Sequence, residues 1–421
     1  MRRTIVLLSA GLLAFSLAVP GAVMAAPGHP SYWVAPPNGT DDTAHIQAGL
    51  DYCAANGPNC TVQLRAGTYK TSQLVEDNFQ GTLQGFGENW TIIEALKGLT
   101  VKTKYWECTP NTSSCLWPDL ITFRYGNIEI SDLAISEPWG GGTATTAYPD
   151  TYLASALYVW DQPAELSVDR VSITGAPDDA ITAIGGFNLY YAIDYEGAPG
   201  VPLTRSLSVR SSSFTTMYEP VYVLNSGSVR VTIGGSPWAG NYFANDFWAV
   251  ELASPESSVF DVSYNTATAT AVDTSVACLS GWQVSQYSIH DNRFTIVGPD
   301  GWGIYLSDNS TAPCIAAKVW DNTIKVLPAA DNTGINVFKT KNTVITSNTI
   351  TGTGAHAIGL FDATNGMVGA NDVGRFTPTA GGAQIYLDSK TAQDTVVCLH
   401  HRDTVHNGGT GNTIIGCTIA P

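Results

Sequence analysis

The chain has 421 residues, of which 44% are hydrophobic and only 13% are charged, and it contains 41 glycines. This composition predicts many short strands joined by turns, with enough apolar side chains for a large core. The formal net charge of −16 at pH 7 argues against nucleic acid, anionic membrane surfaces and strongly anionic polymers as partners, because like charges repel when they meet.

The N-terminal segment predicts export. The first 25 residues read MRRTIVLLSAGLLAFSLAVPGAVMA, in which two arginines precede an apolar run, and Val23 and Ala25 are small residues that suit cleavage by signal peptidase. Residues 1–25 are therefore predicted to be a signal peptide, and residues 26–421 to be secreted, either extracellular or periplasmic. No other stretch is long and apolar enough to span a bilayer, so no membrane partner is expected.

Eight cysteines fit an oxidising compartment, where disulfides are the default. They are Cys53, Cys60, Cys108, Cys115, Cys278, Cys314, Cys398 and Cys417. Proximity in the sequence predicts four disulfides: Cys53–Cys60, Cys108–Cys115, Cys278–Cys314 and Cys398–Cys417. A metal site made by Cys398, His400, His401 and His406 is the rival interpretation, but this spacing is not a recognised zinc motif, and no metal site is predicted.

Residues 41–55, DDTAHIQAGLDYCAA, predict the one clear helix, because an aspartate can cap its start and Ile46, Leu50 and Tyr52 fall near one face. The next segment, CTVQLRAGTYKTSQL, predicts a strand, a glycine turn and a second strand. The stretches GTDDTAHIQAGLDYCA and TVQLRAGTY resemble the N-terminal cap and first coil of pectin-lyase-like, right-handed parallel β-helix proteins. The resemblance implies an all-β solenoid with a short N-terminal capping helix, a fold that many different enzymes share.

A repeated pattern fills the rest of the chain. Short strands such as ALYVW, PVYVL, GIYLS and QIYLD recur between residues 156 and 388 at an average spacing of about 28 residues, which is typical of a solenoid. Their second and fourth residues are mostly aliphatic, so alternation places these inside each coil and the third residue outside. The chain is interpreted as one parallel β-helix domain over residues 26–421, with residues 390–421 closing the end opposite the helix.

Asparagines recur at matching points of a second set of strands. They are Asn265, Asn292, Asn322, Asn348 and Asn371. Asparagine tolerates the left-handed turn conformation and can hydrogen-bond to a stacked neighbour. The series is therefore interpreted as a ladder that stabilises turns, in preference to a ligand site.

Stacked coils lie about 4.8 Å apart, so residues at equivalent positions form columns along the solenoid. Two outward columns gather acids and aromatic residues in the middle coils. The third position of each strand reads Tyr158, Thr182, Tyr222, Glu251, Ala277, Tyr305, Asn336, Gly359 and Tyr386. The position before each strand reads Ser155, Asp179, Glu219, Trp248, Thr274, Trp302, Thr333, His356 and Ala383.

Carboxylates beside aromatic rings are what glycoside hydrolysis uses, since two acids act on the glycosidic bond and rings stack on sugars. Asp179 and Glu219 are the candidates for the acid and for the base or nucleophile, with Asp178 and Glu251 as alternates. The candidate sugar-binding residues are Tyr158, Tyr222, Trp248, Trp302 and Tyr305. The stretch PDDAITAIGG also resembles the Asp-Asp segment of polygalacturonases, but the NTDG, GHG and RIK segments of that family are absent.

The preferred interpretation is a secreted glycoside hydrolase that acts on a neutral or weakly charged polysaccharide without a cofactor. Residues 185–219 and 224–248, interpreted as long insertions that wall the acidic cluster, favour an enzyme. A calcium-dependent polysaccharide lyase is one alternative, with Asp178, Asp179 and Glu219 holding Ca²⁺. A glycan-binding or adhesin-type β-helix without catalysis is another, because the fold alone does not imply an activity. The oligomeric state is left open.

Overall fold

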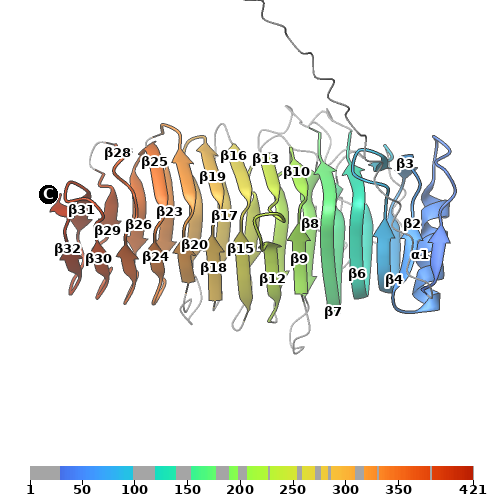
Figure 1. Cartoon of the computed structure of the whole chain (residues 1–421), viewed down its shortest axis with the longest axis horizontal. Helices are drawn as coiled ribbons and strands as arrows, with labels where there is room; N and C mark the ends of the chain where they lie inside the picture. The colour runs from blue at the N-terminus through green and yellow to red at the C-terminus, as the bar shows by residue number, and fades with distance from the viewer. Residues whose placement is uncertain are drawn as a thin grey trace, which may run out of the picture.

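The computed structural model describes residues 29–97, 119–138, 153–176, 189–197, 206–225, 228–253, 258–270, 276–282, 286–308, 317–329, 331–379 and 382–420. Nearly all regular structure in these ranges is β-strand, and the strand pairings are parallel. The coils stack along one long axis, from α1 (Thr43–Asn56) at one end to the last strands and the C-terminus at the other (Figure 1). The predicted parallel β-helix with a short N-terminal helix is confirmed.

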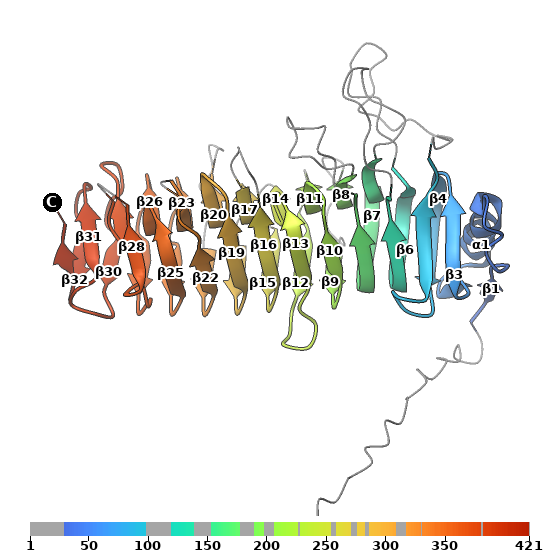
Figure 2. The ribbon, with the colours of Figure 1, turned by 90° about the horizontal axis from the view of Figure 1, so that it is seen from above.

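The strands form three parallel ladders along the axis, called here ladders A, B and C, and neighbouring coils lie side by side in both views (Figures 1 and 2). Ladder A contains β1 (Ser31–Trp33), β2 (Cys60–Gln63), β4 (Leu74–Gln84), β6 (Ile121–Ser136), β7 (Leu153–Thr174), β9 (Ser206–Arg210), β12 (Arg230–Gly234), β15 (Val259–Ser263), β18 (Gln286–His290), β21 (Ala317–Trp320), β24 (Val344–Thr346), β27 (Met367–Gly369), β30 (Thr395–Val397) and β32 (Thr413–Ile415).

Ladder B contains β3 (Gly67–Thr71), β5 (Thr91–Ala95), parts of β6 and β7, β10 (Ser213–Thr215), β13 (Tyr242–Asp246), β16 (Thr266–Thr270), β19 (Arg293–Val297), β22 (Thr323–Val326), β25 (Thr349–Gly354) and β28 (Phe376–Pro378). Ladder C contains parts of β4, β6 and β7, then β8 (Leu189–Gly197), β11 (Glu219–Asn225), β14 (Val250–Ala253), β17 (Val276–Trp282), β20 (Gly301–Ser307), β23 (Thr333–Phe338), β26 (His356–Phe361), β29 (Ile385–Leu387), β31 (Thr404–Asn407) and β33 (Thr418–Ile419).

The core runs along the inside of the coils. In β20, Ile304 and Leu306 are fully buried, whereas Tyr305 between them is only half-buried, as alternation predicts. Ile304 pairs with Ile335 of the next coil, which pairs in turn with Ile358. Burial of each such side chain contributes about 1.5–3 kcal/mol, and no coil can enclose its own, so the stack creates the core.

The helix α1 begins two residues later than predicted, and it contacts β1, β2 and β4. Leu50 is buried as expected, but Tyr52 is 39% exposed and does not belong to the buried face. The Asp41 carboxylate accepts a hydrogen bond from the first helical backbone N–H, whereas Asp42, at the N-cap position, makes no side-chain cap. No helix in the described part of the chain is long and apolar enough to cross a membrane.

Two of the predicted disulfides are confirmed. Cys53 of α1 is bonded to Cys60 of β2, and Cys398 is bonded to Cys417 in the last coils. The interpretation of Cys398 as a zinc ligand is therefore wrong. The predicted pair of residues 108 and 115 lies outside the described residues.

Cys278 is a free, fully buried thiol, so its predicted disulfide with Cys314 is wrong. Its Sγ atom lies 3.8 Å from the carbonyl oxygen of Ala267 and 3.4 Å from that of Thr295. The side chain thus points into the coil interior, where a second cysteine would have to displace core atoms. Cys314 itself lies outside the described ranges.

The asparagine ladder is confirmed as a structural feature, and it gains one member. It consists of Asn241, Asn265, Asn292, Asn322, Asn348 and Asn371, all buried. The Nδ2 and backbone N–H groups of each donate to the Oδ1 atom of the next at 2.9–3.1 Å. The expected left-handed turn falls one residue earlier, for example at Asp291 (φ 56°) and Asp321 (φ 55°), so asparagine is required here for its amide.

Candidate functional site

The outer face of ladder C carries two columns of side chains, called here the strand column and the leading column. The strand column consists of Thr122, Tyr158, Asp194, Tyr222, Glu251, Ser280, Tyr305, Asn336, Gly359, Tyr386 and His406. The leading column lies three residues earlier in each strand and consists of Ser155, Tyr191, Glu219, Trp248, Ala277, Trp302, Thr333 and His356.

A bend between the two columns lets both face outward. The bend is occupied by small residues or proline, and at Gly303 a Cβ atom would meet the carbonyl oxygen of Gly334 at 2.6 Å and Ile324 Cγ2 at 2.7 Å. The Trp302 and Tyr305 rings, one on each side of the bend, have centroids 4.8 Å apart, so both lie on the outer face. Residues three apart can therefore act together here, which regular alternation would not permit.

In the coil that holds β8, the predicted columns are wrong because the strand was misplaced. The predicted residues Thr182 and Asp179 lie outside the described residues, and their places in the columns belong to Asp194 and Tyr191 of β8. The sequence did carry a signal for β8, since Ile193 to Glu196 alternate between apolar and acidic residues, but residues 185–219 were interpreted as an insertion. That segment holds β8, β9 and β10, and residues 224–248 hold β12 and β13, so neither is an insertion into the coil.

The columns also shift by three residues at β17. Ser280 pairs with Glu251 and Tyr305 where Ala277 was predicted, and Ala277 takes the place predicted for Thr274, which lies outside the described ranges. Every residue of VACLSG in this strand is buried, so its alternation does not fix the register. The residue beside Glu251 in the strand column is therefore Ser280, whose side chain is a hydroxyl.

The structure brings two predicted acids into contact. Glu251 pairs directly with Tyr222, and Glu219 precedes Tyr222 by three residues in the neighbouring coil, so the two glutamates lie diagonally across the columns. Their carboxyl groups are hydrogen-bonded to each other. Glu219 is only 6% exposed, and its Oε2 atom has no hydrogen-bond partner among the described residues. This oxygen is itself buried, so a ligand reaches it only when neighbouring side chains move.

The environment keeps a proton on this pair. Burial raises the pKa of Glu219 well above its ordinary value, and the neighbouring Glu251 raises it further. Burial also raises the pKa of Glu251, to about 7, while the hydrogen bond from Glu219 opposes the rise. Near neutral pH, Glu219 is therefore a carboxylic acid, while Glu251 is poised between acid and carboxylate.

Tyrosines surround the pair, and sequence analysis missed three of them. Tyr190, Tyr191 and Tyr218 join Tyr222, with Tyr191 stacked on Tyr222 at 4.7 Å and Tyr190 lying 4.3 Å from Tyr218 between ring centroids. Burial, and then the negative charge of the glutamates, raises the pKa of each of these phenols. The phenols thus stay protonated, and they offer hydrogen-bond donors and ring faces.

The other predicted sugar-binding residues differ in the solvent exposure of their side chains. Trp248 follows Glu219 in the leading column and is half-buried, as are Trp302 and Tyr305 two coils beyond Glu251. Tyr158 is 5% exposed, and its hydroxyl donates to Glu196 at 3.1 Å, so it offers little surface to a ligand.

Two of the four predicted catalytic acids, Asp178 and Asp179, lie outside the described residues. Among the side chains that the structure does place, no group of three or more His, Cys, Asp or Glu gathers as a metal site. Near the pair, Asp194 of the strand column pairs with Tyr222, and Glu196 follows two residues later in β8. Asp194 is buried and is a further acid that the sequence analysis did not identify.

The fold and this face define a parallel β-helix that bears a protonated carboxyl pair among aromatic rings. No family model matches the chain, and no curated protein is similar enough in sequence to match. Among solved structures, the A-module of mannuronan C-5 epimerase AlgE6 from Azotobacter vinelandii is similar at 15% identity and a TM-score of 0.48, over 91% of this chain and 96% of that one.

Two further similar structures differ from the epimerase in what they do. The catalytic unit of a GH87 alpha-1,3-glucanase from Streptomyces thermodiastaticus is 12% identical, with a TM-score of 0.48 over 96% of this chain and 70% of that one. PfbA, a surface adhesin of Streptococcus pneumoniae, is 13% identical, with a TM-score of 0.41 over 86% of this chain and 93% of that one. At these identities the function has to be argued from this chain's own side chains.

Proposed function

We propose that the protein is a secreted glycoside hydrolase in which Glu219 and Glu251 are the catalytic pair, acting on a neutral or weakly charged polysaccharide. The observation that carries the proposal is the contact between two carboxyl groups whose pKa values are both raised by burial among aromatic side chains of ladder C. Hydrolysis of a glycosidic bond needs one carboxylic acid and one carboxylate at the same pH, and a shared proton supplies both. The two disulfides fit a secreted protein.

The protonation states assign the roles. Glu219 holds the proton and donates it to the glycosidic oxygen as the bond to the anomeric carbon breaks. Glu251, as the carboxylate, has one of two roles. It takes a proton from the attacking water, or it attacks the anomeric carbon itself. The direct hydrogen bond between the two groups gives a path for the proton to return to Glu219 after the products leave.

Substrate has to separate the pair. Retaining hydrolysis places the two carboxyl groups about 5 Å apart and inverting hydrolysis about 6.5–9.5 Å apart, both wider than a direct hydrogen bond. A sugar entering over Tyr222 and Trp248 would break the contact and replace it with contacts to its own oxygens. The Oε2 atom of Glu219 is buried without a hydrogen-bond partner, so a sugar that displaces the side chains covering it would contact this oxygen without breaking an existing hydrogen bond.

Two other functions remain as outcomes of the test. A calcium-dependent lyase would need acids in addition to the pair, and Asp178 and Asp179, which lie outside the described residues, are the candidates for holding Ca²⁺. A glycan-binding protein would use the aromatic face alone and would not need a protonated carboxyl pair.

The experiment is a product screen on a panel of neutral and acidic polysaccharides, with and without EDTA. New reducing ends without the ultraviolet absorbance of an unsaturated uronate support the hydrolase. Absorbance that EDTA abolishes supports the lyase, and retention on an immobilised glycan without any product supports a binding protein. Glu165→Gln, at an exposed position of β7 outside ladder C, is the matched control for the glutamate variants.

A further inference from the structure

Beyond Glu251 on the outer face of ladder C, four buried polar atoms have no hydrogen-bond partner among the described residues. They are Ser280 Oγ, Trp282 Nε1, Ser307 Oγ and Asn336 Oδ1, called here the polar cluster. Nearly all buried polar atoms in folded proteins are hydrogen-bonded, so four such atoms in one region need an explanation. A ligand that pairs with them is one.

The register of the strands gathers the polar cluster in three consecutive coils. Tyr305 of β20 pairs with Ser280 of β17 and with Asn336 of β23, and Ser307 pairs with Trp282. Residues two apart in a strand face the same side of the sheet, so all four side chains belong to the outer face. The cluster spans two coil steps, or about 10 Å along the axis.

Three aromatic rings accompany the cluster on the same face. The Tyr305 ring centroid lies 4.8 Å from that of Trp302 and 5.5 Å from that of Trp282, whose plane is inclined to the Tyr305 ring by 67°. These rings are half-buried, whereas Ser280 is fully buried and Ser307 is 2% exposed. A ligand can therefore stack on the exposed part of the rings, but it reaches the polar atoms only when neighbouring side chains move.

The chemistry of the four atoms decides what kind of ligand fits. The Nε1–H group of Trp282 only donates, the Oδ1 atom of Asn336 only accepts, and a serine hydroxyl does either. A ligand that satisfies all of them carries donors and acceptors on a body that packs against ring faces. A pyranose ring with its hydroxyl groups has both features, whereas water would satisfy the polar atoms without gaining from the rings.

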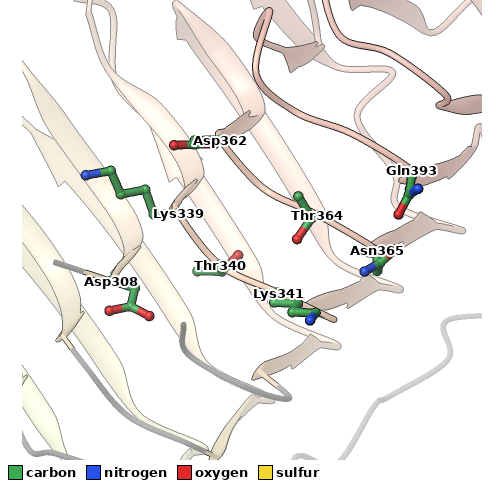
Figure 3. Close-up of a pocket in the computed structure, with 8 residues that line it drawn as sticks. All are labelled: Asp308, Lys339, Thr340, Lys341, Asp362, Thr364, Asn365 and Gln393. Atoms are coloured by element: carbon green, nitrogen blue, oxygen red, sulfur yellow. The ribbon is translucent and has the colours of Figure 1, made fainter. Parts of the chain in front are cut away.

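The charges nearby favour an uncharged sugar. No lysine or arginine belongs to the strand column or the leading column. Lys339 and Lys341 lie in the turn after β23, where they line a hollow of about 450 Å³ together with Asp308 and Asp362 (Figure 3). The two aspartates balance the two lysines, so the hollow brings no net positive charge. Glu251, once ionised, repels a sugar carboxylate in the next coil.

We propose that Ser280 and Trp282 determine which sugar the protein accepts, by hydrogen bonds to hydroxyl groups of an uncharged pyranose that stacks on Trp302 and Tyr305. Ser280 pairs with Glu251 across adjacent coils, so this sugar lies next to the one at the cleaved bond. The inference rests on the proposed function for the polymer that carries the sugar, whereas binding needs no catalysis. A site of buried hydrogen-bonding groups discriminates strongly, because a sugar without matching hydroxyls leaves them unpaired.

The test detects binding at the indole N–H of Trp282. Glu219→Gln protein without its signal peptide, labelled with nitrogen-15 tryptophan, is titrated with tetrasaccharides of glucose, galactose, mannose and xylose, and with the tetrasaccharide of galacturonic acid. We expect a neutral tetrasaccharide to shift the NMR signal of Trp282 Nε1–H, which the Trp282→Phe variant identifies by its disappearance. Ser280→Ala should weaken this binding by about tenfold, because the ligand loses a hydrogen bond in a buried site. Ser288→Ala, on the outer face of ladder A, is the matched control.

The outcomes separate this inference from the proposed function. A Trp282 signal that no neutral sugar moves, or equal binding by the Ser280→Ala and Ser288→Ala variants, would overturn the site. Tighter binding of the galacturonic acid tetrasaccharide than of every neutral one would overturn the assignment to an uncharged sugar. If binding depends on Ser280 but no polysaccharide is hydrolysed, the site stands and the hydrolase proposal fails. Thermal unfolding of each variant shows whether a loss of binding comes from misfolding.

Discussion

The carboxyl groups of Glu219 and Glu251 share a hydrogen bond across two adjacent coils of the β-helix. Glu251 lies in the strand column and Glu219 in the leading column, and the bend between these columns is what turns both toward the same space. Burial makes ionisation of the pair unfavourable, so it retains a proton at a pH at which isolated glutamates are ionised. The predictions below follow from this contact and from the coil that supports it.

Replacement of either glutamate should abolish turnover. We expect Glu219→Gln and Glu251→Gln each to lower kcat by about 10²-fold or more, because the first removes the proton donor and the second removes the carboxylate. The wild-type rate should rise through pH about 7 as Glu251 ionises and fall at higher pH as Glu219 loses its proton. Initial rates of reducing-end release across pH measure this. A Glu165→Gln variant as inactive as these two would contradict the assignment.

The same pair should make stability depend on pH. The folded-state pKa of Glu251 is about 7 against an ordinary value of 4.5, so the folded protein binds more protons than the unfolded chain between these values. The free energy of unfolding should therefore fall as pH rises through this window, by about 3 kcal/mol for this group. Denaturant unfolding at pH 5 and pH 8 measures the change. Glu251→Gln should reduce the slope by the share of this group and leave the share of Glu219, and an unchanged slope would show that Glu251 is solvated.

Removal of one amide from the buried ladder should destabilise the whole stack. Asn292→Ala leaves the backbone N–H and Nδ2 groups of Asn265 without their acceptor, and it removes the Nδ2 donor to the Oδ1 atom of Asn322, which keeps the backbone N–H of residue 292. Each unsatisfied buried group costs about 1–3 kcal/mol, so we expect a loss of at least about 2 kcal/mol in chemical unfolding. Asn127→Ala, at an exposed position of β6, should change stability little. Equal effects of the two variants would mean that the ladder is not stabilising.

The Cys278 thiol should be chemically silent in the folded protein. Burial raises its pKa to about 12, and its sulfur faces the coil interior, so the reactive thiolate is neither populated nor accessible. Peptide mapping after alkylation should find Cys278 unlabelled under native conditions and labelled after unfolding without a reductant. Cys53 should be labelled only after reduction, since it is disulfide-bonded. Native labelling of Cys278 would place this side chain on the surface.

Aromatic residues away from the acids should affect binding more than chemistry. Trp302 contacts Tyr305 two coils beyond Glu251, so Trp302→Ala should raise KM several-fold with a smaller effect on kcat. Trp238→Ala is the control, because this side chain is 93% exposed outside ladder C. Steady-state kinetics on the polysaccharide found in the product screen separate the two parameters. A fall in kcat alone would place Trp302 in the chemistry.

Much of the architecture could be predicted because apolar and polar residues alternate along each strand. The pattern around Ile304 and Leu306 is repeated coil after coil, and each repeat by itself specifies which side chains lie inside. The pattern failed in β17, where apolar residues occupy both faces and Ser280 rather than Ala277 lies beside Glu251. It failed again at β8, the strand that contains Asp194, because this strand was interpreted as part of an insertion.

The sequence by itself determined the solenoid, the buried asparagines and two nearest-neighbour disulfides, because each depends on spacing along the chain. Glu219 and Glu251 were also identifiable as acids on one face. Only the tertiary structure decided that they touch, because contact depends on the bend between the columns and on the register of adjacent coils. Their raised pKa values follow from burial among side chains of neighbouring strands. Contact, burial and stacking join residues from different coils, and no local pattern specifies them.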